Sequence, residues 1–310
     1  MNILTINGIS KNFGSIAALK NVSFFVPEGS VYGILGPNGS GKTTLLGIVT
    51  DVLRASSGAY KFYDGSKPVN EIRKDMGVLL ETPNFYPYLS ARQNLNIVAK
   101  IKGCDAAEIT KALKKVNLIE RQHSSFKTYS LGMKQRLAIA STLLGDPKIV
   151  ILDEPTNGLD PEGISEIRQL IKLLAKEGKT IILASHLLDE VEKVCTHVAI
   201  LKKGELLVSG DIDGTLSKKH GSTGENLTEQ KEKTMMEVVS DDLEKLAGVL
   251  KTLNGILDIN ESEGVITVSC HTDELTAQQV NKHCFDNGII LSRLTVKNKN
   301  LESKFLELTK

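Results

Sequence analysis

The sequence predicts an α/β protein built on a mainly parallel sheet covered by helices, followed by a small α+β domain. Two observations favour this fold class. Over residues 1–216, short strand-like apolar runs alternate with helical patterns, and a helical insertion interrupts them at about residues 86–145. After residues 217–234, whose polar composition is typical of a linker, the alternation starts again and continues over residues 235–310.

In the first part, turn signals separate the strand-like runs. These runs lie at residues 3–9, 22–26, 31–35, 59–63, 149–152, 180–184 and 197–201. Helices are expected at residues 43–50, 164–176 and 187–194, and helical spacing of apolar residues extends over residues 90–144. Because strands of a parallel sheet are buried on both faces, the wholly apolar run 149–152 fits such a strand.

The second part has the element order of a ferredoxin-like domain. Its expected elements are strand 235–239, helix 242–253, strands 256–259 and 265–270, helix 273–287 and strand 289–296, with a short helix at 300–308. Cys270-His271 and His283-Cys284 suggest a metal site, but adjacent residues on a strand face opposite ways, so no zinc site is expected. A dimerisation or regulatory role is the default hypothesis for this domain.

Composition narrows the class of protein. The chain has 38 basic and 37 acidic residues, so its net charge of +1 indicates no nucleic-acid partner. No run approaches the roughly 18 apolar residues of a membrane span, and the first residues lack the layout of a secretory signal. The four cysteines are scattered, as in reduced intracellular proteins. We therefore expect a cytoplasmic protein, with any membrane role exerted through a partner.

Residues 36–43, Gly-Pro-Asn-Gly-Ser-Gly-Lys-Thr, match G-x(4)-G-K-[ST] between a predicted strand and a predicted helix. Glycines allow the backbone to wrap around phosphate oxygens, so that N–H groups and the helix N-terminus face the anion. Lys42 would add a charge at the β- and γ-phosphates, and the Thr43 hydroxyl would bind Mg²⁺. The predicted nucleotide-binding residues here are Gly36, Asn38, Gly39, Ser40, Gly41, Lys42, Thr43 and Thr44.

A second acidic element follows about 110 residues later. The apolar run 149–152 ends in Asp153 and Glu154, and burial of a strand does not explain two adjacent carboxylates. In combination with the phosphate loop, Asp153 is predicted to hold the Mg²⁺ shell. Glu154 is predicted to polarise the water that attacks the γ-phosphate.

Over about residues 1–215 the sequence resembles the nucleotide-binding subunits of ABC transporters. The resemblance implies a P-loop NTPase fold of the ABC type with a helical subdomain. Residues 155–161, Pro-Thr-Asn-Gly-Leu-Asp-Pro, resemble the family's D-loop, with Asp160 as its acid. His186, after Ala-Ser, resembles the switch histidine that contacts the γ-phosphate. Phe13 stands where the family places an aromatic that stacks on adenine, although a single aromatic is equally compatible with a core position.

Two elements depart from the family's usual pattern. The signature, commonly Leu-Ser-Gly-Gly-Gln, is Tyr-Ser-Leu-Gly-Met at residues 129–133. It keeps Ser130 and Gly132, which the resemblance assigns to the γ-phosphate of the opposite subunit. Glu81 replaces the usual glutamine, and its carboxylate would be a Mg²⁺ ligand that adds negative charge beside the phosphates. Both departures are similar to the subgroup involved in bacitracin and lantibiotic self-protection.

The resemblance implies an ATPase that uses ATP and Mg²⁺, pairs head to tail with a second copy, and powers a separate transmembrane permease at the inner face of the cell membrane. The expected function is the ATP-hydrolysing subunit of an exporter. One alternative is a non-transport ABC ATPase acting on a soluble macromolecule, but only 49 positions separate Glu81 from Ser130, too few for the long coiled coil of DNA-repair forms. The other alternative is a binding module that has lost catalysis. The presence of all the expected catalytic residues argues against it, namely Lys42, Asp153, Glu154 and His186.

Overall fold

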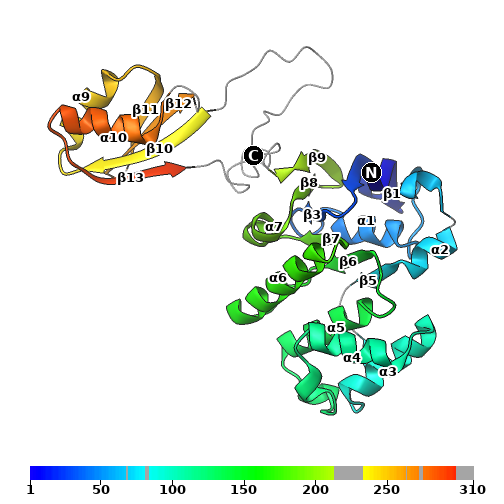
Figure 1. The fold of residues 1–310 in the computed structure, drawn as a ribbon. Coiled ribbons are helices and arrows are strands. Elements are labelled where there is room, and N and C mark those ends of the chain that lie inside the picture. The colour runs from blue at the N-terminus through cyan, green and yellow to red at the C-terminus, as the bar shows by residue number, and fades with distance from the viewer. Residues whose placement is uncertain (68, 81–83, 213–232, 263, 272–274, 298–310) are drawn as a thin grey trace. The chain divides into compact units, whose positions relative to one another are not determined.

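The computed structural model describes residues 1–67, 69–80, 84–212, 233–262, 264–271 and 275–297 (Figure 1). The chain divides into two compact units, with the division between Thr215 and Leu216. The predicted linker, residues 217–234, lies almost wholly outside the described residues, as does the helix predicted at 300–308. The domain limits predicted from the sequence therefore stay predictions.

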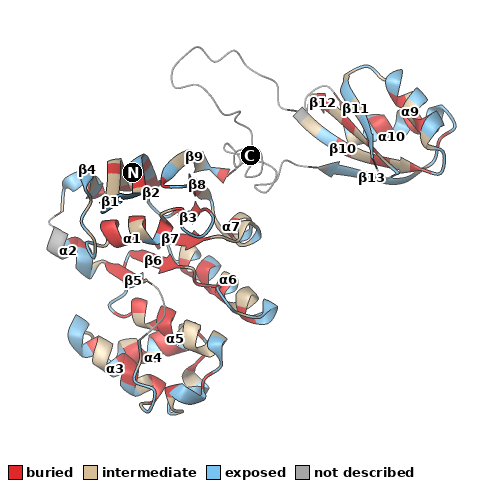
Figure 2. Cartoon of the chain, turned by 180° about the vertical axis from the view of Figure 1, so that it is seen from behind, coloured by how far each residue is buried: buried red, intermediate tan, exposed pale blue. Residues whose placement is uncertain are grey.

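A six-stranded sheet forms the centre of the first unit, in the order β5-β6-β7-β3-β8-β9. Its strands are β3 (Val31–Leu35), β5 (Met76–Leu79), β6 (Ile149–Asp153), β7 (Thr180–Ser185), β8 (His197–Lys202) and β9 (Glu205–Asp211). The first five are parallel, and β9 runs antiparallel to β8. Every residue of β3, β6 and β7 is buried, because other elements cover both faces of the sheet (Figure 2).

Sequence patterns did not identify β5 and β9, the two edge strands of this sheet. β5 has only four residues, too few for a periodicity to appear. β9 forms a hairpin with β8 through Lys203 and Gly204, which both have positive φ, 50° and 83°. Two central residues of positive φ match the twist of antiparallel strands, but a Lys-Gly pair is a weak sequence signal for such a turn.

The first strands of the chain form a separate antiparallel sheet, in the order β2-β1-β4. They are β1 (Asn2–Phe13), β2 (Ile16–Pro27) and β4 (Ser57–Phe62). The sequence predicted shorter strands here and did not separate them from the central sheet. β1 and β2 bury alternate residues, among them Ile6, Phe24 and Val26, so this sheet packs on the core by one face.

Four helices of the first unit are α1 (Lys42–Val49), α2 (Val69–Lys74), α6 (Pro161–Lys176) and α7 (Leu188–Val194). α6 buries Ile167, Ile171 and Leu174, the spacing of one apolar helix face. It begins three residues earlier than the apolar pattern predicted, since Pro161 occupies its first turn and Asp160 caps it.

The helical insertion consists of α3 (Ala91–Lys102), α4 (Ala106–Lys115) and α5 (Leu131–Thr142), with single 3₁₀ turns at Ile119–Arg121 and Phe126–Thr128. Local chemistry sets these boundaries. Ser90 and Gln93 form a capping box at the start of α3, and Gly103, with φ 70°, ends that helix in the left-handed conformation. The helical pattern over residues 90–144 is therefore three helices.

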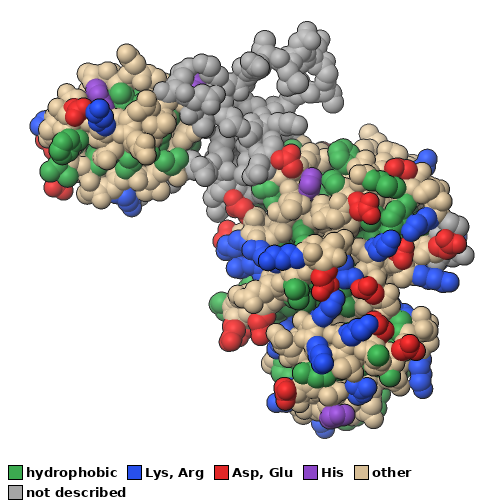
Figure 3. Space-filling view, viewed as in Figure 1, with side chains coloured by type: hydrophobic (Ala, Val, Ile, Leu, Met, Phe, Trp, Pro, Cys, Tyr) green, Lys and Arg blue, Asp and Glu red, His purple; other side chains and the backbone are tan. Residues whose placement is uncertain are grey.

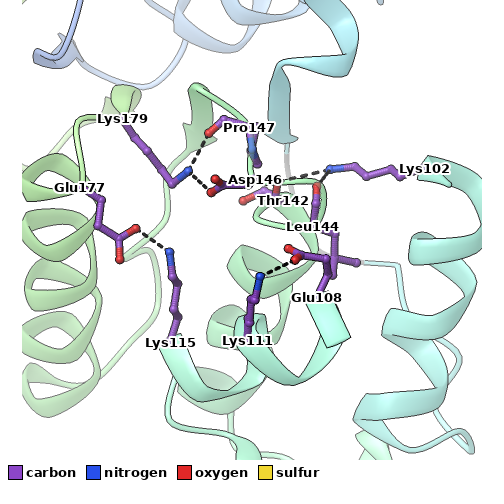
Figure 4. Close-up of polar contacts among 10 residues, drawn as sticks. All are labelled: Lys102, Glu108, Lys111, Lys115, Thr142, Leu144, Asp146, Pro147, Glu177 and Lys179. Carbon is purple, nitrogen blue, oxygen red and sulfur yellow. Dashed lines mark hydrogen bonds and ion pairs between the residues drawn. The ribbon is translucent and has the colours of Figure 1, made fainter. Parts of the chain in front are cut away.

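Polar contacts join the helical insertion to the sheet (Figure 4). Lys179, directly before β7, is buried and donates to Asp146 at 2.6 Å and to the carbonyl of Pro147 at 2.8 Å. Lys102 of α3 donates to the carbonyls of Thr142 and Leu144 at the end of α5, and burial lowers the pKa of its ammonium group. The contacts of Lys179 join the connection between α5 and β6 to the start of β7, and those of Lys102 hold the end of α5 against α3.

The second unit contains β10 (Lys233–Ser240), α9 (Leu243–Lys251), β11 (Ile256–Ser262), β12 (Val265–His271), α10 (Ala277–Asp286) and β13 (Leu291–Lys297). The strands form an antiparallel sheet in the order β11-β12-β10-β13, and the element order is the ferredoxin-like β-α-β-β-α-β. Cys270 and Cys284 are both buried in its apolar core, and burial raises the pKa of each thiol. α10 begins directly after Thr276, which forms a capping box with Gln279, and so begins later than predicted.

Charged side chains of both signs are interspersed on the face of the first unit seen in Figure 3, as the nearly balanced composition leads one to expect. No helix in the described part of the chain combines the length and the hydropathy that crossing a bilayer requires.

Candidate functional site

Three polar segments leave the central sheet at the same edge. Strand β7 lies between β3 and β6, and its register pairs Leu35 with Ser185 and Asp153 with Ala184. The phosphate loop follows β3, Glu154 follows β6 and His186 follows β7. Because the carboxyl ends of neighbouring parallel strands meet at one edge, these segments converge there, the place where open α/β sheets bind ligands.

The phosphate loop is the connection between β3 and α1. Two of its glycines are required by close approach of the backbone to other parts of the chain. A Cβ on Gly36 would lie 2.3 Å from the carbonyl oxygen of Leu201, and one on Gly41 would lie 2.7 Å from that of Ala18. Gly41 also has φ 105° at the N-cap of α1. Any larger residue at these positions would have to move the loop.

The exposure of the loop's side chains varies along its length. Asn38, Gly39 and Thr43 are exposed, Thr44 is half-buried, and Ser40 is buried. The Ser40 backbone carbonyl accepts a hydrogen bond from Gly204, at 3.1 Å, which ties the loop to the β8–β9 hairpin. The exposed residues surround the start of α1, where N–H groups without helical partners favour an anion.

Lys42 folds back over this loop. Its Nζ donates to the carbonyl oxygen of Gly36 at 2.8 Å and to that of Pro37 at 3.3 Å. It also lies 3.3 Å from Glu154 Oε1, and only 5 % of its side chain is exposed. A nearly buried ammonium held by two carbonyls and one carboxylate is a preformed positive centre at the mouth of the loop.

Glu154 connects Lys42 to the third segment. Its Oε2 lies 2.8 Å from Nδ1 of His186. Its backbone has φ 46°, an uncommon conformation for a non-glycine residue, and its N–H donates to the Ala184 carbonyl at 3.0 Å. Strained backbone of this kind concentrates at functional sites. The structure thus joins all three predicted catalytic residues, Lys42, Glu154 and His186, by direct contacts.

Asp153 precedes Glu154 on the buried strand and is 5 % exposed. Its carboxylate and the exposed hydroxyl of Thr43 are both hard oxygen donors, and both lie at the edge of the sheet described above. Glu81, the third predicted metal ligand, lies outside the described residues.

The signature serine and the D-loop acid both occupy helix N-caps. Ser130 Oγ accepts a hydrogen bond from the N–H of Met133 at 3.3 Å, and Asp160 Oδ1 accepts one from the N–H of Gly163 at 3.0 Å. Leu131, beside Ser130, has a side chain that is 53 % exposed. A Cβ on Gly132 would meet nothing closer than 4.0 Å outside its own helix. Both of these hydrogen bonds are local to the first turn of the helix that each residue caps.

Phe13, at the end of β1, is 47 % exposed, so the alternative of a core position is wrong. The Nζ of Lys11 lies 4.9 Å from the centre of its ring. The ring is therefore available for stacking on a flat ligand.

Ser185 is a site residue that sequence analysis did not single out. Its Oγ accepts a hydrogen bond from the N–H of Leu187 at 3.0 Å and so shapes the turn that carries His186. The signal was present in the sequence, since a serine that directly precedes a candidate histidine at a strand end commonly forms such a turn.

A family model described as ABC transporter matches residues 19–157. An uncharacterised ABC transporter ATP-binding protein of Bacillus subtilis, YdbJ, is 36 % identical over 99 % of this chain and 95 % of its own length. The bacitracin transport ATP-binding protein BcrA of Bacillus licheniformis is 34 % identical over 99 % of this chain and 97 % of its own.

This chain belongs to the ATP-binding proteins of ABC transporters. Among solved structures, an ATP-binding cassette in a dimeric post-hydrolysis state with ADP and Pi is similar, with a TM-score of 0.59 and 28 % identity. That match covers 67 % of this chain and 98 % of the cassette.

This ABC subunit binds and hydrolyses ATP, as the sequence resemblance implied. The two kinds of match differ in extent. The relatives from both Bacillus species align over both units, whereas the solved cassette covers two thirds of the chain. The second unit is therefore an addition to the cassette that these relatives share.

Proposed function

We propose that this subunit drives the export of an antimicrobial peptide of the bacitracin or lantibiotic type, as one of two copies attached to a separate membrane permease. Alignment with the bacitracin transport protein over nearly the whole of both chains supports the substrate class. The dimeric form of the similar cassette supports pairing of two copies. The permease would hold the subunit at the cytoplasmic face of the cell membrane.

The contacts of Glu154 support its role as the general base. Its two carboxylate oxygens contact Lys42 and His186. A γ-phosphate competes with Glu154 for Lys42, since both are anions that seek the same ammonium. Nucleotide binding thus releases one carboxylate oxygen to accept a proton from the attacking water, while His186 keeps the other in place.

The oxygen donors at the sheet edge fit Mg²⁺, which prefers hydroxyl, carboxylate and phosphate oxygens. Thr43 and Asp153 would hold the ion, with Glu81 as a further ligand. When bound, it neutralises charge on the β- and γ-phosphates. The proposed nucleotide contacts are the loop residues 36–44 for the phosphates and Phe13 for the adenine ring.

Ser130, Gly132 and Asp160 would complete the site of the second copy. Ser130 is the N-cap of α5, so an anion placed against it also meets the positive end of that helix. The exposed side chain of Leu131 and the open space around Gly132 leave this helix end accessible. A head-to-tail dimer would thus present two equivalent composite sites.

The direct contact between Glu154 and both Lys42 and His186 carries the assignment of Glu154 as general base. Replacing Glu154 with Gln removes the proton acceptor but keeps the shape. We expect Glu154→Gln to lower ATP turnover at least about 100-fold and to accumulate an ATP-bound dimer, measured by phosphate release and by light scattering. Glu162→Gln, at an exposed position of α6, is the matched control. Normal turnover in Glu154→Gln would refute the role of general base.

A further inference from the structure

Arg168 and Glu190 form an ion pair with two contacts beside the catalytic residues. Nη2 of Arg168 lies 2.8 Å from Oε1 of Glu190, and Nε lies 3.3 Å from Oε2. The side chains are 25 % and 13 % exposed. A guanidinium that meets a carboxylate through two parallel hydrogen bonds fixes orientation as well as distance.

The position of this pair in the chain is informative. Glu154 follows β6 and leads through the D-loop into α6, which carries Arg168. His186 follows β7 and leads directly into α7, which carries Glu190 in its first turn. The ion pair therefore joins the two helices that follow two catalytic residues in contact with each other.

The surroundings of the pair are largely apolar. Ile171, Leu183 and Val194 line a small cavity together with both charged side chains. Loss of one partner would leave the other charge in an environment of low polarity, which is strongly unfavourable. The pair therefore resists separation of α6 from α7 more than an exposed ion pair would.

We propose that Arg168 is a positioning residue for ATP hydrolysis. Through Glu190 it holds the first turn of α7, and so the preceding segment with His186, at hydrogen-bonding distance from Glu154. Among the residues that the structure describes, no hydrogen bond or ion pair joins Arg168 to the phosphate loop or to Lys42. The proposal rests on the functions proposed above for Glu154 and His186.

The same helix provides a matched control. Asp189 and Lys193 form an ion pair at 3.4 Å within α7, with side chains that are 72 % and 48 % exposed. The two residues are four positions apart on the same helix, so their ion pair joins α7 to no other element. Exposed pairs of this kind contribute little to stability, so Asp189→Asn tests loss of charge on α7 without loss of the connection to α6.

The experiment measures steady-state ATP hydrolysis by the full chain with Arg168→Met, Arg168→Lys, Glu190→Gln and Asp189→Asn, together with thermal unfolding of each. We expect Arg168→Met and Glu190→Gln to lower kcat about 10-fold or more, because small displacements of catalytic groups are costly. KM for ATP should change less than about twofold, since the phosphate loop is untouched. Arg168→Lys, which keeps the charge but not the two-contact geometry, should be intermediate, and Asp189→Asn should behave as the parent.

The exchanged pair, Arg168→Glu with Glu190→Arg, should recover most of the kcat lost by either single change. A structural role alone would lower the amount of folded protein and would not separate kcat from KM. Unchanged kcat in folded Arg168→Met, an equal loss in Asp189→Asn, or a parallel rise in KM would overturn the proposal. If Arg168→Met does not fold, the kcat values of Arg168→Lys and of the exchanged pair test the proposal in its place.

Glu154→Gln measured alongside separates this inference from the proposed function. If Glu154→Gln hydrolyses ATP normally, the proposed catalytic assignment fails. If Glu154→Gln is inactive while the Arg168 and Glu190 variants retain the parent kcat, only the positioning role of Arg168 fails.

Discussion

The central sheet of the first unit and the sheet of the second unit bury their residues in different ways. In β6 all five residues are buried, whereas in β12 buried residues alternate with half-buried ones (Figure 2). The first pattern belongs to a parallel sheet covered on both faces, and the second to an antiparallel sheet whose helices pack on one face.

This difference explains where polar chemistry can occur in each unit. A sheet covered on both faces has no room for polar side chains along its strands, so they gather at the strand ends, as Glu154 and His186 do. The second unit distributes polar residues such as Thr267 and Ser269 along the open face of its sheet. In the described part of that unit no group of three or more metal-binding side chains comes together.

The largest expected effect concerns the burial of β6. Ile151→Ala should lower the free energy of unfolding by about 2–5 kcal/mol, because it leaves a cavity in a core covered on both sides. Val265→Ala, on the half-buried pattern of β12, should cost less than about 1 kcal/mol. Urea unfolding followed by circular dichroism measures both. Equal costs would show that the two sheets are not covered differently.

The second prediction concerns the location of the chemistry. Lys42→Met should reduce ATP hydrolysis about 100-fold or more, because it removes the positive centre that is proposed to face the phosphates. Lys282→Met removes an exposed lysine from α10 of the second unit and should leave kcat unchanged. Phosphate release under excess Mg-ATP measures both. A large loss with Lys282→Met would mean that the second unit takes part in hydrolysis.

The smallest expected effect is the pH dependence of one ion pair of the first unit. The hydrogen bond from Lys179 lowers the pKa of Asp146 below its usual value of 3.8. The stabilisation that the charged Asp146 gives the folded state is therefore complete above pH 3.8. It is lost as the pH falls through the lowered pKa. Since Asp146 is 77 % exposed, the contribution should be under about 1 kcal/mol.

The measurement is thermal unfolding of the parent and of Asp146→Asn between pH 6 and 3. The difference in stability between the two proteins should shrink as the solution is acidified. A difference that stays constant, or that grows at low pH, would contradict the assigned direction of the pKa shift.

Much of the first unit could be predicted because its signals are local. The phosphate loop depends on glycines at fixed spacing, and the structure shows why Gly36 and Gly41 admit no side chain. The burial of β3, β6 and β7 follows from their apolar composition. The predicted nucleotide-binding and metal-binding roles stay predictions, and Glu81 lies outside the described residues.

Other features had no local signal. β5 and β9 are sheet edges whose partners are distant or antiparallel, and β4 joins the separate sheet of β1 and β2 through a pairing with β1 across about 50 residues. Ser130 and Asp160 were recognised by motif, but their function as helix caps needed the backbone geometry. Phe13 could be separated from the core only by its exposure in the folded chain.

The sequence alone determined the family and the order of the motifs, and it predicted which residues bind phosphate and move a proton. These depend on residue type and spacing along the chain. Only the tertiary structure decided which of these residues meet. Lys42, Glu154 and His186 lie up to 144 positions apart in sequence and come together because β3, β6 and β7 are neighbours in one sheet. The pairing of Arg168 with Glu190 depends in the same way on the packing of α6 against α7, which no local pattern encodes.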